Sequence, residues 1–311
     1  MPDFILHHYD GSPFSEKLRL IFGFKGLHWR SVKIPVIMPK PDVVALTGGY
    51  RKTPIVQVGA DVYCDTALIA QLIEQHHPAP TLFPASAPLA PIFAQWADST
   101  LFWTVIPYAM QPSGRAHIFK GVASEVMQAF AADRAPFTAG MKRQTVADAA
   151  ANLESYVKAL DAQLSDGRPW LLGTEASIAD FAVAHCGWYV RRAGPVADIL
   201  QPHARFSAWL DRVLAFGHGR FDKSSSEEAL AVAAAASAAS SYAPCAVAPG
   251  LGFEAGQPVT VTPTDYGHDP VAGTLVGLST TEAVLRRTDP RAGTVHVHFP
   301  RAGFQIKEER A

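Results

Sequence analysis

The stretch "YDGSPFSEKLRL", residues 9–20, decides the fold of the first part of the chain. An alternating segment over residues 3–8 precedes it and predicts a strand. Apolar side chains then recur at helical spacing and predict a helix over residues 13–25. Ser12 stands where an N-cap belongs, and a proline follows at the first helical position, where a missing N–H costs nothing. The stretch therefore predicts a strand that turns into a hydroxyl-capped helix.

The sequence that follows completes one compact α/β layer. Residues 28–34 predict a second strand, and a proline-rich stretch after them reads as irregular. "TPIVQV" and "DVYC" predict a hairpin joined by a Gly-Ala turn. Residues 65–77 predict a covering helix with Asp65 at its N-cap. The order β-α-β, then β-β-α, is that of the thioredoxin fold.

The run Ser12-Pro13-Phe14-Ser15 has two interpretations. Ser12 can be a helix cap and nothing more, since serine is among the leading N-cap residues. It can also belong to an anion or thiolate site, because a helix N-terminus offers free N–H groups and the positive end of the dipole. The two roles are compatible, since a hydroxyl can accept from the helix and donate to a sulfur anion. Thioredoxin-like proteins carry Cys-Pro-x-Cys here, so two serines exclude thiol–disulfide exchange through this motif.

Three segments resemble a known family when they are taken together. They are "SPFSEKLRLIFGFKGL" (12–27), "RKTPIVQV" (51–58) and "CDTALIAQLIE" (64–74), in that order and at that spacing. They resemble the cytosolic glutathione transferases, in particular the serine-type classes (tau-, zeta- or beta-like). The segment "RPWLLGTEASIADFAV" (168–183) resembles the signature of that family's helical C-terminal domain.

The resemblance implies a role for individual residues. It implies that Ser12 hydrogen-bonds the glutathione thiolate and that the backbone of Thr53, before a cis-proline at Pro54, pairs with the tripeptide. Thr53 departs from the usual Val or Ile, and Asp65 is one methylene shorter than the usual Glu. The implied glutathione-binding residues are Lys52, Thr53, Pro54, Asp65 and Thr66, with Lys52 approaching the glycyl carboxylate.

Each of these residues also has an ordinary structural interpretation. Asp65 can be a plain N-cap, and Lys52 can be a solvated surface charge. Ser15 can be a first-turn helix residue without a chemical role, or it can replace Ser12 as the thiolate donor. Lys40 is a further candidate for the glycyl carboxylate.

Composition excludes some classes of function. The chain has 311 residues, is 48% hydrophobic and carries a formal net charge of -1. That balance gives no electrostatic case for binding nucleic acid or an anionic membrane. Neither a signal-peptide pattern nor a run of 18 apolar residues occurs, so we expect a cytoplasmic protein without a membrane span. Three scattered cysteines, Cys64, Cys186 and Cys245, indicate reduced thiols.

Changes in pattern along the chain predict four parts. Helical spacing dominates from about residue 88, whereas an Ala/Ser-rich stretch and then period-two segments follow residue 222. The predicted parts are a thioredoxin-like glutathione-binding domain (1–80), an all-helical domain (88–222), a linker or helix (223–244) and a small β domain (245–311).

The electrophile pocket should lie between the thioredoxin-like and the helical domain, beside Ser12. Aromatic and sulfur-containing side chains on or after the first long helix of the helical domain are the candidates, although each can equally be core packing. The predicted pocket residues are Phe14, Phe102, Trp103, Tyr108 and Met110. Ser177 and Asp180 form a capping-box pattern and are expected to serve folding.

The last 65 residues predict five short strands, in an arrangement that could be an SH3-like barrel. From residue 242 onward six Lys and Arg face seven Asp and Glu, which argues against a nucleic-acid role. His296 and His298 share one strand face, but neutral strand histidines are more common than ligands, so no metal is expected.

The resulting hypothesis is a glutathione transferase that uses glutathione as co-substrate against a small hydrophobic electrophile. The family resemblance also implies a homodimer. The alternative is a non-catalytic interaction module with the same fold, which the added β domain favours.

Overall fold

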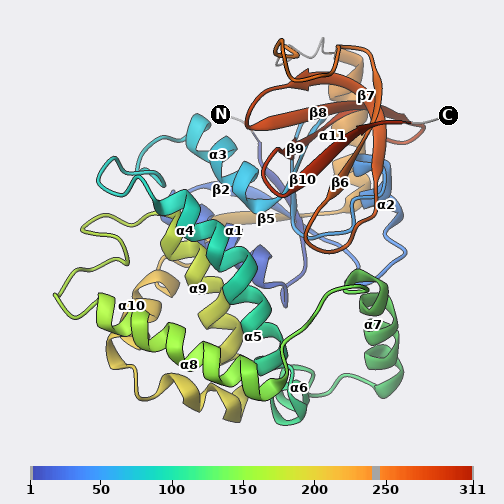
Figure 1. The fold of residues 1–311 in the computed structure, drawn as a ribbon. Helices are drawn as coiled ribbons and strands as arrows, with labels where there is room; N and C mark the ends of the chain where they lie inside the picture. Colours follow the sequence, from blue (N-terminus) through green and yellow to red (C-terminus); the bar gives the residue numbers. More distant parts are fainter. Residues whose placement is uncertain (1–2, 240–245, 310–311) are drawn as a thin grey trace.

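The computed structural model describes residues 3–239 and 246–309. Its first part is a four-stranded sheet with helices on both faces (Figure 1), and its strands follow one another in the predicted order. β1 runs parallel to β2 and antiparallel to β3, and β3 pairs antiparallel with β4. The elements are β1 (Ile5–His8), α1 (Pro13–Phe24), β2 (His28–Lys33), α2 (Pro41–Thr47), β3 (Ile55–Val58), β4 (Asp61–Cys64) and α3 (Thr66–His76).

The second part is a helical bundle that packs against α1. Its core helix α9 (Ile178–Arg191) begins at a capping box, in which Ser177 and Asp180 exchange hydrogen bonds. Asp180 is fully buried and also accepts from the indole N–H of Trp209, so the box fixes the bundle core as well as the helix start. The other elements are α4 (Ala90–Trp96), a π-helical turn η1 (Ala97–Leu101), α5 (Phe102–Ala109), α6 (Pro112–Ile118), α7 (Ser124–Phe137), α8 (Val146–Gln163), a 3-10 helix η2 (Gly194–Leu200) and α10 (Ala204–Leu214).

The remaining part extends the first sheet on both sides. β5 pairs parallel with β2, and β9 pairs parallel with β4, so one sheet runs in the order β10-β6-β7-β8-β9-β4-β3-β1-β2-β5. In Figure 1 the last strands stand beside the N-terminal sheet and away from α8. The elements are β5 (Arg220–Ser224), α11 (Ser226–Ala239), β6 (Pro258–Pro263), β7 (Val271–Leu278), β8 (Glu282–Asp289), β9 (Gly293–Pro300) and β10 (Phe304–Glu308).

The two faces of the N-terminal strands belong to two different cores. Phe4, Leu6 and Val56 pack with α1, α3 and the helical bundle. The alternate residues Ile5 and Ile55 pack with α2, α11 and the added strands. Successive side chains of a strand point to opposite faces, so one short strand can serve both cores. The added strands therefore share a hydrophobic core with the N-terminal domain.

Several expectations about the fold are confirmed and several need correction. The thioredoxin-like domain, the helical domain and the five C-terminal strands are present. The stretch read as irregular contains α2, which starts with Pro41 at its first turn and ends at Gly48 in a left-handed conformation. The Ala/Ser-rich stretch contains a helix, α11, and the strand β5 before it was not predicted. The five strands are not a separate sheet, because β9 pairs parallel with β4 of the N-terminal domain.

Candidate active site

Ser12 lies where β1 turns into α1, as its cap pattern predicts. Its Oγ accepts a hydrogen bond from the backbone N–H of Ser15 at 3.2 Å, and the residue is 2% exposed. The hydroxyl hydrogen of Ser12 remains able to donate toward a ligand at the helix N-terminus. Ser15 is fully buried, and its Oγ has no hydrogen-bond partner within the described part of the chain. Both hydroxyls therefore stay candidates for a sulfur anion.

A buried ionic network holds the loop that carries Ser12. Arg19 from α1 donates to the carbonyl oxygens of Tyr9 at 3.4 Å and Asp10 at 3.1 Å. Glu16 fixes the Arg19 guanidinium at 2.5 Å, and His218, far along the chain, contacts Glu16 at 3.0 Å. The position of the Ser12 hydroxyl thus depends on side chains that no local sequence motif connects.

The predicted glutathione-binding residues lie directly before β3 and at the junction of β4 and α3. The Thr53–Pro54 peptide bond is cis, as the resemblance implies. Asp65 has φ 75°, a conformation that residues other than glycine rarely adopt, and its carboxylate accepts from the N–H of Ala67 at 2.8 Å. Burial raises the pKa of this carboxyl, which the Ala67 N–H bond opposes. An unfavourable backbone conformation kept in a folded protein is typical of functional sites.

Thr66 and Lys17 connect this loop to the helical domain. The fully buried ammonium of Lys17 donates to the Thr66 hydroxyl at 3.2 Å and contacts the Asp98 carboxylate at 2.5 Å. His185 of α9 approaches the other oxygen of Asp98 at 3.0 Å. The two domains are therefore fixed to each other by a charged chain directly behind the candidate site.

The two lysines proposed for the glycyl carboxylate have different environments. Lys40 is buried, and its Nζ donates to the Thr53 hydroxyl at 3.1 Å. Burial, together with the positive charges of Arg134 and Arg51, lowers the Lys40 pKa to about 8. Lys52 contacts the Asp265 carboxylate at 2.5 Å and is therefore not simply a solvated charge.

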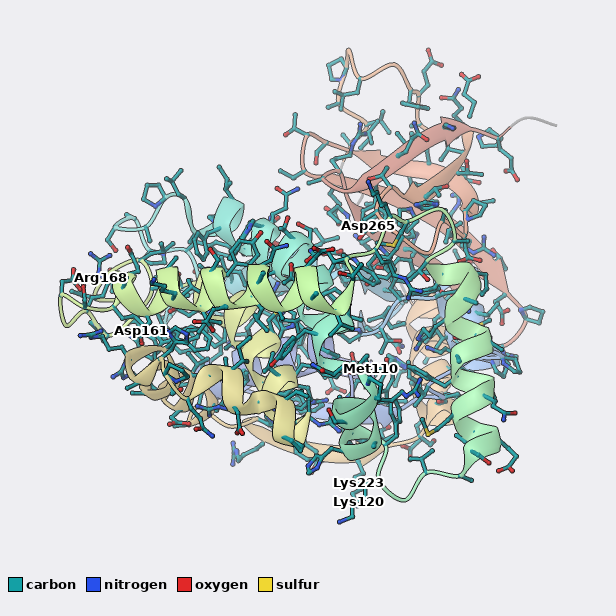
Figure 2. The ribbon with its side chains drawn as sticks, turned by 60° about the horizontal axis from the view of Figure 1, so that its bottom comes forward. Met110, Lys120, Asp161, Arg168, Lys223 and Asp265 are labelled. Atoms are coloured by element: carbon teal, nitrogen blue, oxygen red, sulfur yellow. The ribbon has the colours of Figure 1, made fainter. Side chains whose placement is uncertain are left out.

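The loop between β6 and β7 reaches the candidate site from the added strands. Besides Asp265, it places the Tyr266 ring 4.0 Å from the Lys52 ammonium, in a cation–π contact. The Tyr266 ring packs on Trp103 of α5 and Phe137 of α7, with centroids 5.0 and 5.4 Å apart. Figure 2 shows Asp265 at the boundary between the added strands and the helical domain. Nothing in the sequence near residue 265 indicates this contact.

The predicted pocket residues do not form a single wall. Phe14 packs on Phe102, with centroids 4.7 Å apart, and on His185, within the contact between the domains. Tyr108 donates its hydroxyl hydrogen to the carbonyl of Val196 at 2.7 Å, which holds it against η2. The two remaining candidates, Trp103 and Met110, stand at opposite ends of α5.

Met110 directly follows α5, and its sulfur accepts from the Tyr189 hydroxyl at 3.5 Å. Figure 2 shows Met110 between the end of α5 and α6, well away from Asp265. Trp103, at the other end of the helix, contacts Tyr266.

Comparison with known proteins identifies the family. Residues 6–81 match the glutathione S-transferase N-terminal domain, and residues 143–212 match the glutathione S-transferase C-terminal domain. The crystal structure of a GST-like protein from Pseudomonas syringae is 40% identical, covers 99% of this chain and 100% of its own, and superposes with a TM-score of 0.81. The chain belongs to the glutathione S-transferase family.

Another glutathione S-transferase structure shows which part of the fold is more widely shared. The enzyme from Rhodospirillum rubrum F11 is 18% identical over 68% of this chain and 88% of its own, with a TM-score of 0.53. This likeness concerns the fold alone. The Pseudomonas syringae protein, in contrast, matches almost the whole chain, so the added strands of this family member recur there. A search of curated proteins gave no match.

Two further observations concern the described residues. No helix among residues 3–239 and 246–309 is long and apolar enough to cross a membrane. The same ranges contain no group of three or more His, Cys, Asp or Glu side chains suited to hold a metal ion. Cys64 and Cys186 are buried free thiols, and Cys245 lies outside the described residues.

Proposed function

We propose that this member of the glutathione S-transferase family is a glutathione transferase in which Ser12 stabilises the glutathione thiolate. The observation that carries the proposal is the place of Ser12 at the N-terminus of α1, where its oxygen accepts from the Ser15 N–H and its hydrogen stays available. The buried contacts of Arg19 with the Tyr9 and Asp10 carbonyls support it, because they fix the loop before the hydroxyl.

The Ser12 hydrogen bond and the helix dipole together can stabilise the thiolate without a separate general base. A free thiol titrates near pH ~8.5. A two-unit decrease in the thiol pKa requires about 2.7 kcal/mol of preference for the anion. One charge-assisted hydrogen bond contributes about 1.5–3 kcal/mol. The helix dipole adds about 0.3–1 kcal/mol. The thiolate would then attack an electrophile held beside it.

The surrounding loops would bind the rest of glutathione. In this proposal the Thr53 backbone pairs with the tripeptide, Asp65 and Thr66 hold the γ-glutamyl end, and Lys52 or Lys40 holds the glycyl carboxylate. We also propose that the protein acts in the cytoplasm as a homodimer, as the family resemblance implies.

The first experiment is an ultraviolet difference spectrum with glutathione at neutral pH. The wild type should show a thiolate band that disappears in Ser12→Ala. The matched control is Ser15→Ala, because both serines are buried in the same helical turn. Loss of the band in Ser15→Ala alone would transfer the role to Ser15. Absence of the band in the wild type would contradict the proposal.

One observation favours the alternative, a non-catalytic interaction module. Lys52, a proposed ligand of the glycyl carboxylate, already contacts Asp265 at 2.5 Å. A module whose glutathione site is closed by its own chain would bind no glutathione by calorimetry. Recovery of glutathione binding in Asp265→Asn would show that this contact closes the site.

A further inference from the structure

Arg192 stands against the loop that carries Ser12. It follows the last residue of α9, is half-buried, and its guanidinium lies over the Trp188 ring at 4.7 Å. Its Nη1 and Nη2 lie 3.4 and 3.9 Å from the point where a side chain at Gly11 would begin. Gly11 directly precedes Ser12, and adjacent α-carbons are about 3.8 Å apart. The guanidinium is therefore a neighbour of the residue that directly precedes Ser12.

The charge of Arg192 is unmatched. Its Nη1 is buried and has no hydrogen-bond partner, and no ion pair with a carboxylate is formed, among residues 3–239 and 246–309. In contrast, three basic side chains on or beside α1 each contact a carboxylate at 2.5 Å. These pairs are Lys17–Asp98, Arg19–Glu16 and Lys25–Glu74. A buried donor without an acceptor costs folding free energy, so its retention points to a ligand oxygen.

Positive charge also exceeds negative charge around Asp133 of α7. Lys40, Arg51 and Arg134 cluster around the carboxylate of Asp133, which contacts Arg51 at 2.9 Å and Arg134 at 2.7 Å. The Asp269 carboxylate approaches Arg51 at 3.9 Å. The excess of cations agrees with the low pKa of the Lys40 ammonium, to which burial contributes most.

Arg134 and Arg192 act on a common neighbour, Tyr189. Burial raises the pKa of the Tyr189 phenol to about 12, and the positive charges of Arg192 and Arg134 oppose that increase. Tyr189 also donates to the sulfur of Met110, a residue of the predicted second pocket. Tyr189 thus lies between Arg192 and Met110, one of the residues predicted for the second pocket.

We propose that the electrophile carries a carboxylate and that Arg192 binds it while the thiolate attacks. This inference rests on the proposed transferase function and refines its substrate class from a hydrophobic electrophile to an anionic one. A guanidinium suits this role because its planar donors match the two oxygens of a carboxylate.

The reaction can be written for the probe 4-chloro-3-nitrobenzoate. The thiolate sulfur adds to the ring carbon that bears chlorine and forms a C–S bond. The C–Cl bond then breaks, and chloride leaves with the bonding electron pair. The proton of the glutathione thiol goes to solvent, so no oxidant or reductant is needed.

The experiment compares this benzoate with the neutral 4-chloro-3-nitrobenzamide, which has the same leaving group and nitro activation. We expect a kcat/KM ratio of benzoate to amide of about 10 or more in the wild type. In Arg192→Gln the kcat/KM for the benzoate should fall by about 10- to 100-fold, and the preference for the benzoate over the amide should be lost. Arg192→Lys should keep part of the preference. The matched control is Arg191→Gln, since Arg191 precedes Arg192 and pairs with Asp211 at 2.5 Å.

The outcomes separate this inference from the proposed function. Turnover of the amide that requires Ser12, without a preference for the benzoate, overturns this inference alone. Equal losses on both probes in Arg192→Gln also overturn it, because they indicate a structural role. If neither probe is turned over, the proposed function fails. The carboxylate site is then tested by 3-nitrobenzoate quenching of tryptophan fluorescence: quenching that Arg192→Gln removes supports the site, and no quenching overturns it.

Discussion

The two ends of the candidate site differ in whether their positive side chains are paired with a carboxylate. At the end that faces the added strands, Lys52 contacts Asp265 and lies against the Tyr266 ring. At the end that faces α9, Arg192 lies against Gly11 and pairs with no carboxylate of the described residues. A cation that already has a counter-ion must exchange it to bind a ligand carboxylate, whereas an unmatched cation can bind one directly. We therefore expect the Lys52–Asp265 end to control access of glutathione and the Arg192 end to control which electrophile is selected.

The strongest test of what a counter-ion contributes here is Lys17, a fully buried cation that is paired with a carboxylate. Its side chain is 0% exposed and contacts Asp98 at 2.5 Å. Lys17→Met should lower the free energy of unfolding by about 3–5 kcal/mol, because it removes the ammonium partner of the Asp98 carboxylate, which then keeps the contact with His185. Chemical denaturation would measure this.

The matched control is Lys120→Met. Lys120 is exposed, and Figure 2 shows it at the lower edge of the molecule, away from the core. This change should stay within about 0.5 kcal/mol. Similar losses of unfolding free energy in Lys17→Met and Lys120→Met would mean that pairing with a carboxylate contributes little to stability. The difference in pairing between Lys52 and Arg192 would then carry no functional argument.

A second test concerns the pairing of β4 with β9, which joins the added strands to the N-terminal sheet. His298 of β9 contacts Glu282 at 2.6 Å and Asp61 of β4 at 3.2 Å. Burial alone would lower the His298 pKa, but the hydrogen bonds to the two carboxylates outweigh burial and raise it above 6.5. The stabilisation is therefore complete below about pH 6.5 and is lost as the pH rises through the raised value.

We expect the denaturation midpoint of the wild type to fall over that pH range. His298→Gln should remove most of the fall and cost about 1–3 kcal/mol of stability at low pH. The control is His28→Gln, since His28 and Asp222 form an exposed pair at the β2–β5 joint. That change should cost less than about 1 kcal/mol. If His298→Gln leaves the pH dependence of the denaturation midpoint unchanged, the assignment of the fall to His298 is contradicted.

The smallest expected effect is at the paired end itself. Asp265→Asn should lower the KM for glutathione by up to about fivefold with kcat unchanged, because the Asp265 carboxylate, whose side chain is 45% exposed, no longer competes for Lys52. Asp269→Asn is the matched control, because Asp269 lies in the same loop but approaches Arg51. A higher KM in Asp265→Asn would show instead that Asp265 itself contacts glutathione.

Sequence reasoning succeeds where the physical cause is local. The cap at Ser12, the helix after it and the five C-terminal strands depend on residues a few positions apart, and the structure contains them. α2 could have been found too, since Pro41 and Gly48 are ordinary start and stop signals for a helix.

Sequence reasoning fails where the cause is distant. Lys52 and Asp265 are 213 residues apart, and each is an ordinary surface charge in its own segment. Arg192 is unusual because its buried Nη1 has no hydrogen-bond partner among the described residues. No sequence pattern can show that such a partner is missing. The pairing of β9 with β4 likewise depends on the meeting of two edges, and period-two patterns do not specify which strands are neighbours.

The β4–β9 pairing also has a consequence for how the chain reaches its native state. Asp61 and His298 meet although 237 residues separate them. During synthesis from the N-terminus, β4 must remain without its β9 partner until Gly293–Pro300 has left the ribosome. Exposed edges promote association with other chains, and contacts of such long sequence separation form slowly. The nascent N-terminal domain is therefore a natural client for chaperones, and a ribosome stalled before residue 293 would present an incomplete, aggregation-prone sheet.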